Sequence, residues 1–147
     1  MANYYTQGTV APYLPLTKIH RDLIDLNMYD EEYEDPALEI LAKQIWGEDP
    51  YDRSLGLRCE RVNQDEYYLF AEESLGEADL AFLEWLAKTD PEMPAIEVEF
   101  AHSCSKLRPG SFGGGAWFIT PDHTDSMHTS MWLSEVRKLY ADAIVED

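Results

Sequence analysis

The side chains best suited to nucleophilic catalysis or metal binding lie between residues 102 and 128. His102 and Cys104 are two positions apart in an expected strand and therefore share one of its faces. A thiol beside an imidazole could act as a nucleophile with its base, and further histidines at 123 and 128 could complete a zinc site. The spacing favours neither use, because the sequence has no CxxC pair and no His-Glu-x-x-His motif. We therefore predict no catalytic residue and no metal site.

A glycine-rich loop with two cations follows this strand. Its candidate binding residues are His102, Cys104, Lys106, Arg108, Gly113, Gly114 and Gly115, whose side chains and backbone amides could hold an anion or a small ligand. The loop lacks the Gly-Lys-Ser/Thr and Gly-x-Gly-x-x-Gly motifs of phosphate-binding loops, and a strand follows it rather than a helix. Three glycines before a strand are more typical of close backbone packing. A ligand-binding or enzymatic site here is therefore the second hypothesis.

The charge balance excludes several classes of partner. The chain has 29 acidic residues against 11 Lys and Arg, which gives a net charge of −18. Such a protein is repelled by nucleic-acid phosphates and by anionic membranes, so direct binding to DNA, RNA or a lipid surface is not expected. It is attracted to basic surfaces, such as those of nucleic-acid-binding proteins. A third hypothesis is a structural module whose charge serves solubility only.

The acidity is concentrated between residues 22 and 52, where eleven acids stand against one base. Tyrosines, which protein interfaces favour, are interleaved with these acids. The candidate binding residues are Asp30, Glu31, Glu32, Glu34, Asp35 and Glu39. An array of carboxylates can imitate a phosphate backbone toward a basic groove. The leading hypothesis is therefore a non-enzymatic interaction protein without a cofactor, in its specific form a DNA-mimicking inhibitor of a nucleic-acid-handling or host-defence enzyme.

The size of the chain bounds its organisation. A length of 147 residues is typical of one domain and suffices for a hydrophobic core without disulfides or metals. The two cysteines, Cys59 and Cys104, are not a disulfide framework and are expected to be reduced thiols in a cytoplasmic protein. No signal-peptide pattern is visible, and no apolar stretch approaches the length of a membrane span.

The elements that must position these residues follow from apolar periodicity and turn residues. In chain order they are an extended segment or edge strand over 4–16, helices over 18–28 and 36–46, a strand hairpin over 55–62 and 66–72, a helix over 75–88, strands over 95–104 and 116–120, and a helix over 129–145. Pro12 and Pro15 restrict the first segment to an edge strand or an extended entry segment. Ser74 and Glu77 fit a capping box for the third helix.

The order of these elements predicts the fold class. It is α+β, with an antiparallel or mixed sheet and helices on one face. The first elements match the split β-α-β order of ferredoxin-like folds, and an extra strand and a C-terminal helix extend it. In the last helix Trp132, Val136, Tyr140 and Ile144 recur at spacings of four along one face.

The run Phe100–Ala116 (FAHSCSKLRPGSFGGGA), with Ile119-Thr120 and Thr129–Leu133 after it, resembles a group of small, uncharacterised acidic proteins of bacteria and their mobile elements. The similarity extends loosely to Asn3–Gln7 and Ala71–Ser74 and covers about a third of the chain. The resemblance implies a bacterial or phage setting and carries no activity to transfer. Small acidic proteins that block nucleic-acid-handling enzymes fit that setting by analogy.

Overall fold

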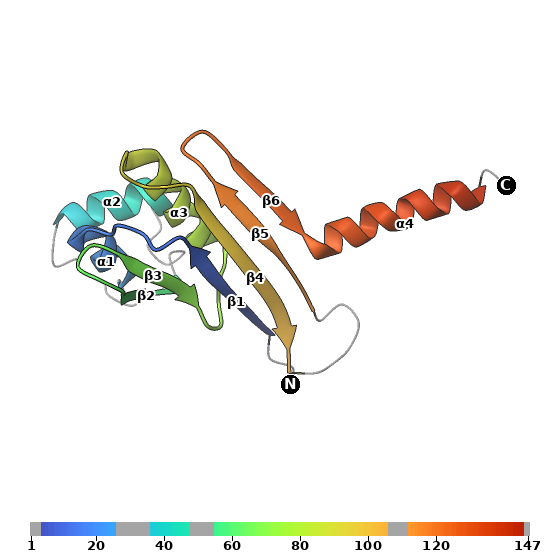
Figure 1. Cartoon of the computed structure of the whole chain (residues 1–147), viewed down its shortest axis with the longest axis horizontal. Coiled ribbons are helices and arrows are strands. Elements are labelled where there is room, and N and C mark those ends of the chain that lie inside the picture. Colours follow the sequence, from blue (N-terminus) through green and yellow to red (C-terminus); the bar gives the residue numbers. More distant parts are fainter. Residues whose placement is uncertain (1–3, 26–35, 48–54, 106–111, 146–147) are drawn as a thin grey trace.

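Six strands and four helices make up the part of the chain that the structure describes (Figure 1). The computed structural model describes residues 4–25, 36–47, 55–105 and 112–145. In chain order the elements are β1 (Tyr4–Ala11), α1 (Lys18–Ile24), α2 (Pro36–Trp46), β2 (Leu57–Arg61), β3 (Tyr67–Ala71), α3 (Glu77–Thr89), β4 (Ile96–Cys104), β5 (Gly113–Ile119), β6 (Thr124–His128) and α4 (Thr129–Val145).

All six strands form one antiparallel sheet in the order β2-β3-β1-β4-β5-β6. The predicted α+β class, the antiparallel sheet and the β2–β3 hairpin are thereby confirmed. β1 lies between β3 and β4, so the prediction of an edge strand at the N-terminus is wrong. The prolines allow this central position because β1 ends at Ala11, and Pro12 and Pro15 follow it without removing a hydrogen bond from the ladder.

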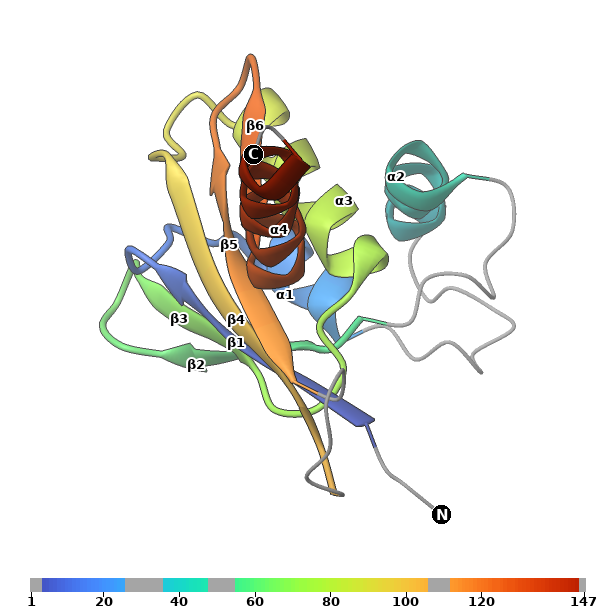
Figure 2. The ribbon, with the colours of Figure 1, turned by 90° about the vertical axis from the view of Figure 1, so that its right-hand side faces the viewer.

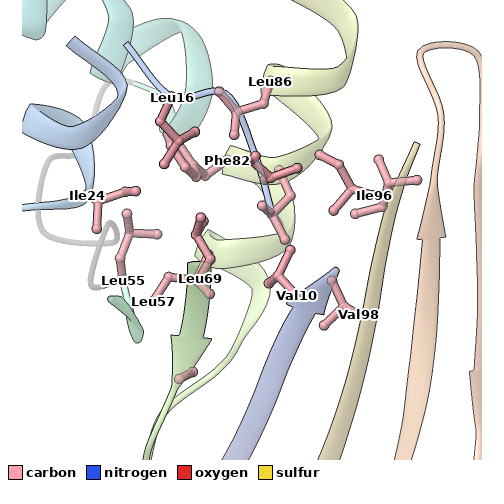
Figure 3. Close-up of a cluster of buried hydrophobic side chains, with 14 of the residues drawn as sticks. Val10, Leu16, Ile24, Leu55, Leu57, Leu69, Phe82, Leu86, Ile96 and Val98 are labelled. Atoms are coloured by element: carbon pink, nitrogen blue, oxygen red, sulfur yellow. The ribbon is translucent and has the colours of Figure 1, made fainter. Parts of the chain in front are cut away.

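Helices α1, α2 and α3 cover one face of the sheet, and no helix in the described part of the chain covers the other, which we call the open face (Figure 2). The hydrophobic core lies between these two layers (Figure 3). Val10 and Val98 of the sheet belong to one buried cluster with Phe82 and Leu86 of α3. Each such side chain contributes about 1.5–3 kcal/mol when it is fully removed from water. Packing between the helices and the covered face of the sheet therefore stabilises the fold, whereas the open face takes no part in this core.

The start of α1 confirms the predicted cap at Thr17. The Thr17 hydroxyl accepts the His20 N–H (3.4 Å), and the Thr17 N–H donates to His20 Nδ1 (3.1 Å). The His20 ring is buried and meets Trp85 edge to face, with ring centroids 5.7 Å apart. Burial lowers the pKa of His20, although the charge of Asp90 acts in the opposite direction. The helix ends at Ile24, and positions 26–28 of the predicted helix lie outside the described residues.

A buried carboxylate, Asp79, joins the start of α3 to the start of β2. Its side chain is fully buried and accepts the backbone N–H groups of Gly56 (3.0 Å), Leu57 (2.9 Å) and Gly76 (2.9 Å). α3 therefore begins after Gly76, and the predicted capping box at Ser74 is wrong. Burial raises the pKa of Asp79, and the three backbone hydrogen bonds offset only part of this effect.

The C-terminal part of the chain differs from the prediction in three ways. β5 begins at Gly113, so the glycine triplet belongs to a strand rather than to a loop. The sequence did not indicate β6, because Thr124–His128 is short and lacks apolar alternation. α4 has the predicted bounds, but its apolar stripe does not pack on the sheet, since Trp132 is 56% and Tyr140 70% exposed.

Candidate functional site

Most of the predicted acidic site lies outside the described residues, namely Asp30, Glu31, Glu32, Glu34 and Asp35. The sixth candidate, Glu39, lies in α2 and pairs with Lys43 one turn later (Oε1 to Nζ 3.3 Å). Both side chains are about half exposed, so the pair contributes little to stability. Because α2 belongs to the helix layer, Glu39 does not face the open side of the sheet (Figure 2).

The loop candidates are brought together only in part. His102 and Cys104 lie at the end of β4 on the same face, where Cys104 is buried. His102 is exposed, and its Nδ1 lies 2.8 Å from the hydroxyl of Thr6 on β1, so it is hydrogen-bonded but is not a core residue. Lys106 and Arg108 lie outside the described residues, and a ligand site at this loop stays a prediction.

Two of the three glycines of β5 have the close-packing role that the sequence favoured. A Cβ at Gly114 would collide with the carbonyl oxygen of Phe100, and a Cβ at Gly115 would collide with that of Met127. A Cβ at Gly113 would make only ordinary contacts at 3.5 Å. Gly114 and Gly115 therefore let the backbones of β4, β5 and β6 approach more closely than a side chain would allow.

Aromatic rings gather around Phe100 on the face that the helices cover. Its ring centroid lies 5.4 Å from that of His102, 5.1 Å from Trp117 and 5.5 Å from His128. His123 lies apart from them in the exposed turn before β6. No group of three or more His, Cys, Asp or Glu side chains that could hold a metal ion comes together within the described ranges. These rings act in packing and offer no evident chemistry.

The open face of the sheet carries a set of charged residues that sequence reasoning did not single out. On β4, Ile96, Val98 and Phe100 are buried toward the helices, whereas Glu97 and Glu99 alternate with them and are exposed on the opposite face. This alternation was visible in the sequence. It identified the strand, but only the sheet order shows which carboxylates from other strands lie beside it.

Five exposed carboxylates share this face. Directly paired residues of an antiparallel sheet point to the same side, so the strand register assigns them. They are Glu60 on β2, Glu72 just after β3, Glu97 and Glu99 on β4, and Asp125 on β6. Two bases of the described residues accompany them. The Arg58 guanidinium donates to the carbonyl oxygens of Leu55 (3.4 Å) and Leu57 (3.0 Å), and His123 Nε2 lies 2.9 Å from Asp125 Oδ1.

A first hollow of about 580 Å³ lies over β2, β3, β1 and β4 on the open face. Carboxylates of Glu60, Glu72 and Glu99 line it together with the rings of Tyr68 and Phe70. The two rings stack with centroids 5.4 Å apart, which gives the hollow an aromatic wall. Carboxylates beside aromatic faces suit a guanidinium group, which can pair with the first and stack on the second.

A second hollow of about 560 Å³ lies over β4, β5 and β6 on the same face. Phe118 pairs with Glu97 on one side and with Asp125 on the other, so an apolar ring stands between two carboxylates. Met127 lines the same hollow, and both Phe118 and Met127 are large exposed apolar side chains. This second hollow has a more apolar floor than the first and an acidic rim.

Comparison of the chain with protein-family models, curated proteins and solved structures finds no match. The resemblance to small acidic bacterial proteins therefore stays a prediction. None of the helices in the described part of the chain is long and apolar enough to cross a membrane.

Proposed function

We propose that this protein is an interaction protein that binds a basic protein partner on the open face of its sheet. The observation that carries the proposal is the first hollow, where three carboxylates surround an aromatic wall and no helix covers them. A net charge of −18 attracts a basic partner from a distance and accelerates its association.

The composition of the first hollow specifies the side chain that it would receive. An arginine can donate two hydrogen bonds to a carboxylate such as Glu60 or Glu72 while its plane stacks on Tyr68 or Phe70. Lysine provides a point charge and loses the stacking contact, so an arginine-rich surface is the better match. Arginine-rich surfaces are common on proteins that bind nucleic acids.

The specific form of this proposal is a DNA-mimicking inhibitor of a nucleic-acid-handling enzyme. The open-face carboxylates would occupy the groove that normally receives phosphates, and the acids between residues 22 and 52 would add to the net negative charge that attracts the partner from a distance. In this form, duplex DNA and the protein compete for one partner. Binding would also weaken steeply with salt, because the contacts are largely ionic.

The decisive experiment compares two charge-reversed variants in capture from a bacterial lysate. The first, Glu60→Lys with Glu72→Lys, reverses the first hollow. The matched control, Glu92→Lys with Asp122→Lys, makes the same change in net charge at exposed loop positions away from it. We expect a captured protein of basic isoelectric point that the control retains, that the first variant loses, and that added duplex DNA displaces.

Two outcomes would count against this function. If the hollow variant and the control capture the same proteins, the open face is not the binding surface. If the captured partner is retained in the presence of excess duplex DNA, the protein binds that partner outside its DNA-binding site and does not imitate DNA. Circular dichroism of both variants checks that the fold is kept.

We also propose that the first seven elements, β1 to β4 with α1, α2 and α3, form a ferredoxin-like unit. The order β2-β3-β1-β4, with α1 and α2 between β1 and β2 and with α3 between β3 and β4, supports this assignment. β5, β6 and α4 would then be an extension beyond the β4 edge. A variant that ends after β4 would test this view, because a complete unit should remain folded without the extension.

A further inference from the structure

Helix α4 projects from the rest of the described part of the molecule, and the apolar side chains along it are exposed (Figure 1). Trp132, Leu133, Leu139 and Tyr140 are all more than half exposed, and with Val136 they form one stripe at spacings of three and four residues. A helix with an apolar stripe of this width normally packs against another surface. The stripe therefore indicates a contact with a second molecule.

The junction between β6 and α4 prevents the helix from covering its own sheet. β6 ends at His128 and α4 begins at Thr129, so no loop residue is available to reverse the chain. The Thr129 hydroxyl also accepts the N–H of Gly114 on β5 at 3.1 Å, which fastens the start of the helix to the sheet. α4 consequently projects beyond the β6 edge, as Figure 1 shows.

We propose that the occupant is a second copy of this chain, whose α4 docks in the second hollow of the open face while the first copy's α4 docks reciprocally. The hollow offers Phe118 and Met127 to the apolar stripe. Its carboxylates, Glu97 and Asp125, meet a helix whose apolar stripe is bordered by Arg137. This interface adjoins the first hollow, since Glu99 lines both, but it does not depend on the proposed function.

Charge complementarity determines which side of the helix faces the hollow. Arg137 follows Leu133 by four residues and precedes Tyr140 by three, so it borders the apolar stripe. Lys138 follows Val136 by two residues and therefore lies on the opposite face of the helix. Glu135 borders the opposite side of the stripe, three residues after Trp132. The helix therefore presents one basic border, and only that border can face the carboxylates of the hollow without repulsion.

The area of the stripe favours reciprocal exchange over a single contact. Aromatic side chains bury roughly 150–250 Å² each, so Trp132 and Tyr140, with the leucines beside them, expose about 400 Å². One docked helix would bury about twice that area in total, which is the size of a crystal-packing contact. Two helices exchanged about a two-fold axis bury about 1,600 Å², the usual size of a specific interface.

A charge-exchange experiment tests the proposal by sedimentation velocity over a concentration series of about 1–100 µM. The wild-type chain should form a dimer. The helix variant, Arg137→Glu with Lys138→Glu, and the hollow variant, Glu97→Lys with Asp125→Lys, should each self-associate at least about 100-fold more weakly. An equimolar mixture of the two variants should form a dimer again, because each helix then meets a hollow of opposite charge.

Each alternative arrangement gives a different result. If the wild type remains monomeric at the highest concentration, no such interface exists. If the helix variant is monomeric while the hollow variant still dimerises, α4 pairs elsewhere, and the docking site is wrong. Trp132→Ser provides a second disruption that leaves every charge in place and should also yield monomers, whereas Glu92→Lys with Asp122→Lys should leave the dimer intact.

Discussion

Removal of the Asp79 carboxylate should destabilise the protein more than any change at an exposed acid. In Asp79→Ala the N–H groups of Gly56, Leu57 and Gly76 all lose their acceptor. A buried donor left without a partner costs about 1–3 kcal/mol, so three of them give a loss of at least about 3 kcal/mol. In Asp79→Asn the amide oxygen still accepts hydrogen bonds, but its NH₂ group confronts a backbone donor, and the loss is about 1–3 kcal/mol.

The pH dependence of this loss has a defined sign. Burial raises the folded-state pKa of Asp79 above that of the unfolded chain. At pH values between these two pKa values the folded chain therefore keeps the Asp79 proton, whereas the unfolded chain releases it. The stability that protonated Asp79 contributes is complete below the ordinary pKa of 3.8 and is lost as the pH rises through the folded-state pKa. The difference in unfolding free energy between wild type and Asp79→Asn should therefore narrow as the pH rises through this range.

Urea unfolding followed by tryptophan fluorescence measures these differences, since Trp85 lies in α3 itself. Asp122→Asn and Asp122→Ala are the matched controls, because this aspartate is exposed in the turn before β6. Asp79→Ala within about 0.5 kcal/mol of the wild type would refute the reasoning. It would mean that water replaces the carboxylate at the junction of β2 and α3 at no cost.

Two further predictions follow from packing and burial. Gly115→Ala should lower the thermal unfolding midpoint markedly, because its Cβ would collide with a carbonyl oxygen of β6. Gly113→Ala should have little effect on the midpoint, since its Cβ would make only ordinary contacts. Equal midpoints for the two variants would contradict the close approach of β5 and β6. His20 has a lowered folded-state pKa, so its stabilising effect is complete above pH 6.5 and declines as the pH falls below that value. His20→Gln should remove this part of the pH dependence of the unfolding free energy, and an unchanged slope between pH 5 and 7 would exclude it.

The regular elements could be predicted from the sequence where local patterns decide them. The bounds of α2 and α4 agree with the apolar periodicity, and the β2–β3 hairpin agrees with its turn residues. β6 could not be predicted in this way, since it is stabilised by pairing with β5 rather than by its own side chains. The central position of β1 also depends on long-range pairing, with β3 on one side and β4 on the other. The sequence-based prediction missed it because it applied the preference of proline for edge strands to the whole segment 4–16, although both prolines lie after the end of the strand.

The candidate site shows the same division between local and long-range information. Glu97 and Glu99 could be recognised as the exposed side of a strand from their alternation with apolar residues. That they share a face with Glu60 and Asp125 could not be recognised, because β2 and β6 lie at opposite edges of the sheet and only the strand register shows which side their residues face. The exposed stripe of α4 likewise looks like a core stripe in the sequence, since periodicity does not say whether the surface that covers it belongs to the same molecule.

Because α4 follows β6 without a loop, a small rotation at the start of the helix produces a larger displacement at its far end. Its 17 residues extend for about 25 Å, so a rotation of about 5° at Thr129 moves the far end by about 2 Å. Small changes in the twist or register of β5 and β6 are therefore amplified at the tip of the helix. The glycines that bring β4, β5 and β6 close together consequently also set the direction of α4, and Gly114 does so through its hydrogen bond to Thr129. A substitution at one of these glycines would change the direction of the helix although the sequence of α4 stays the same.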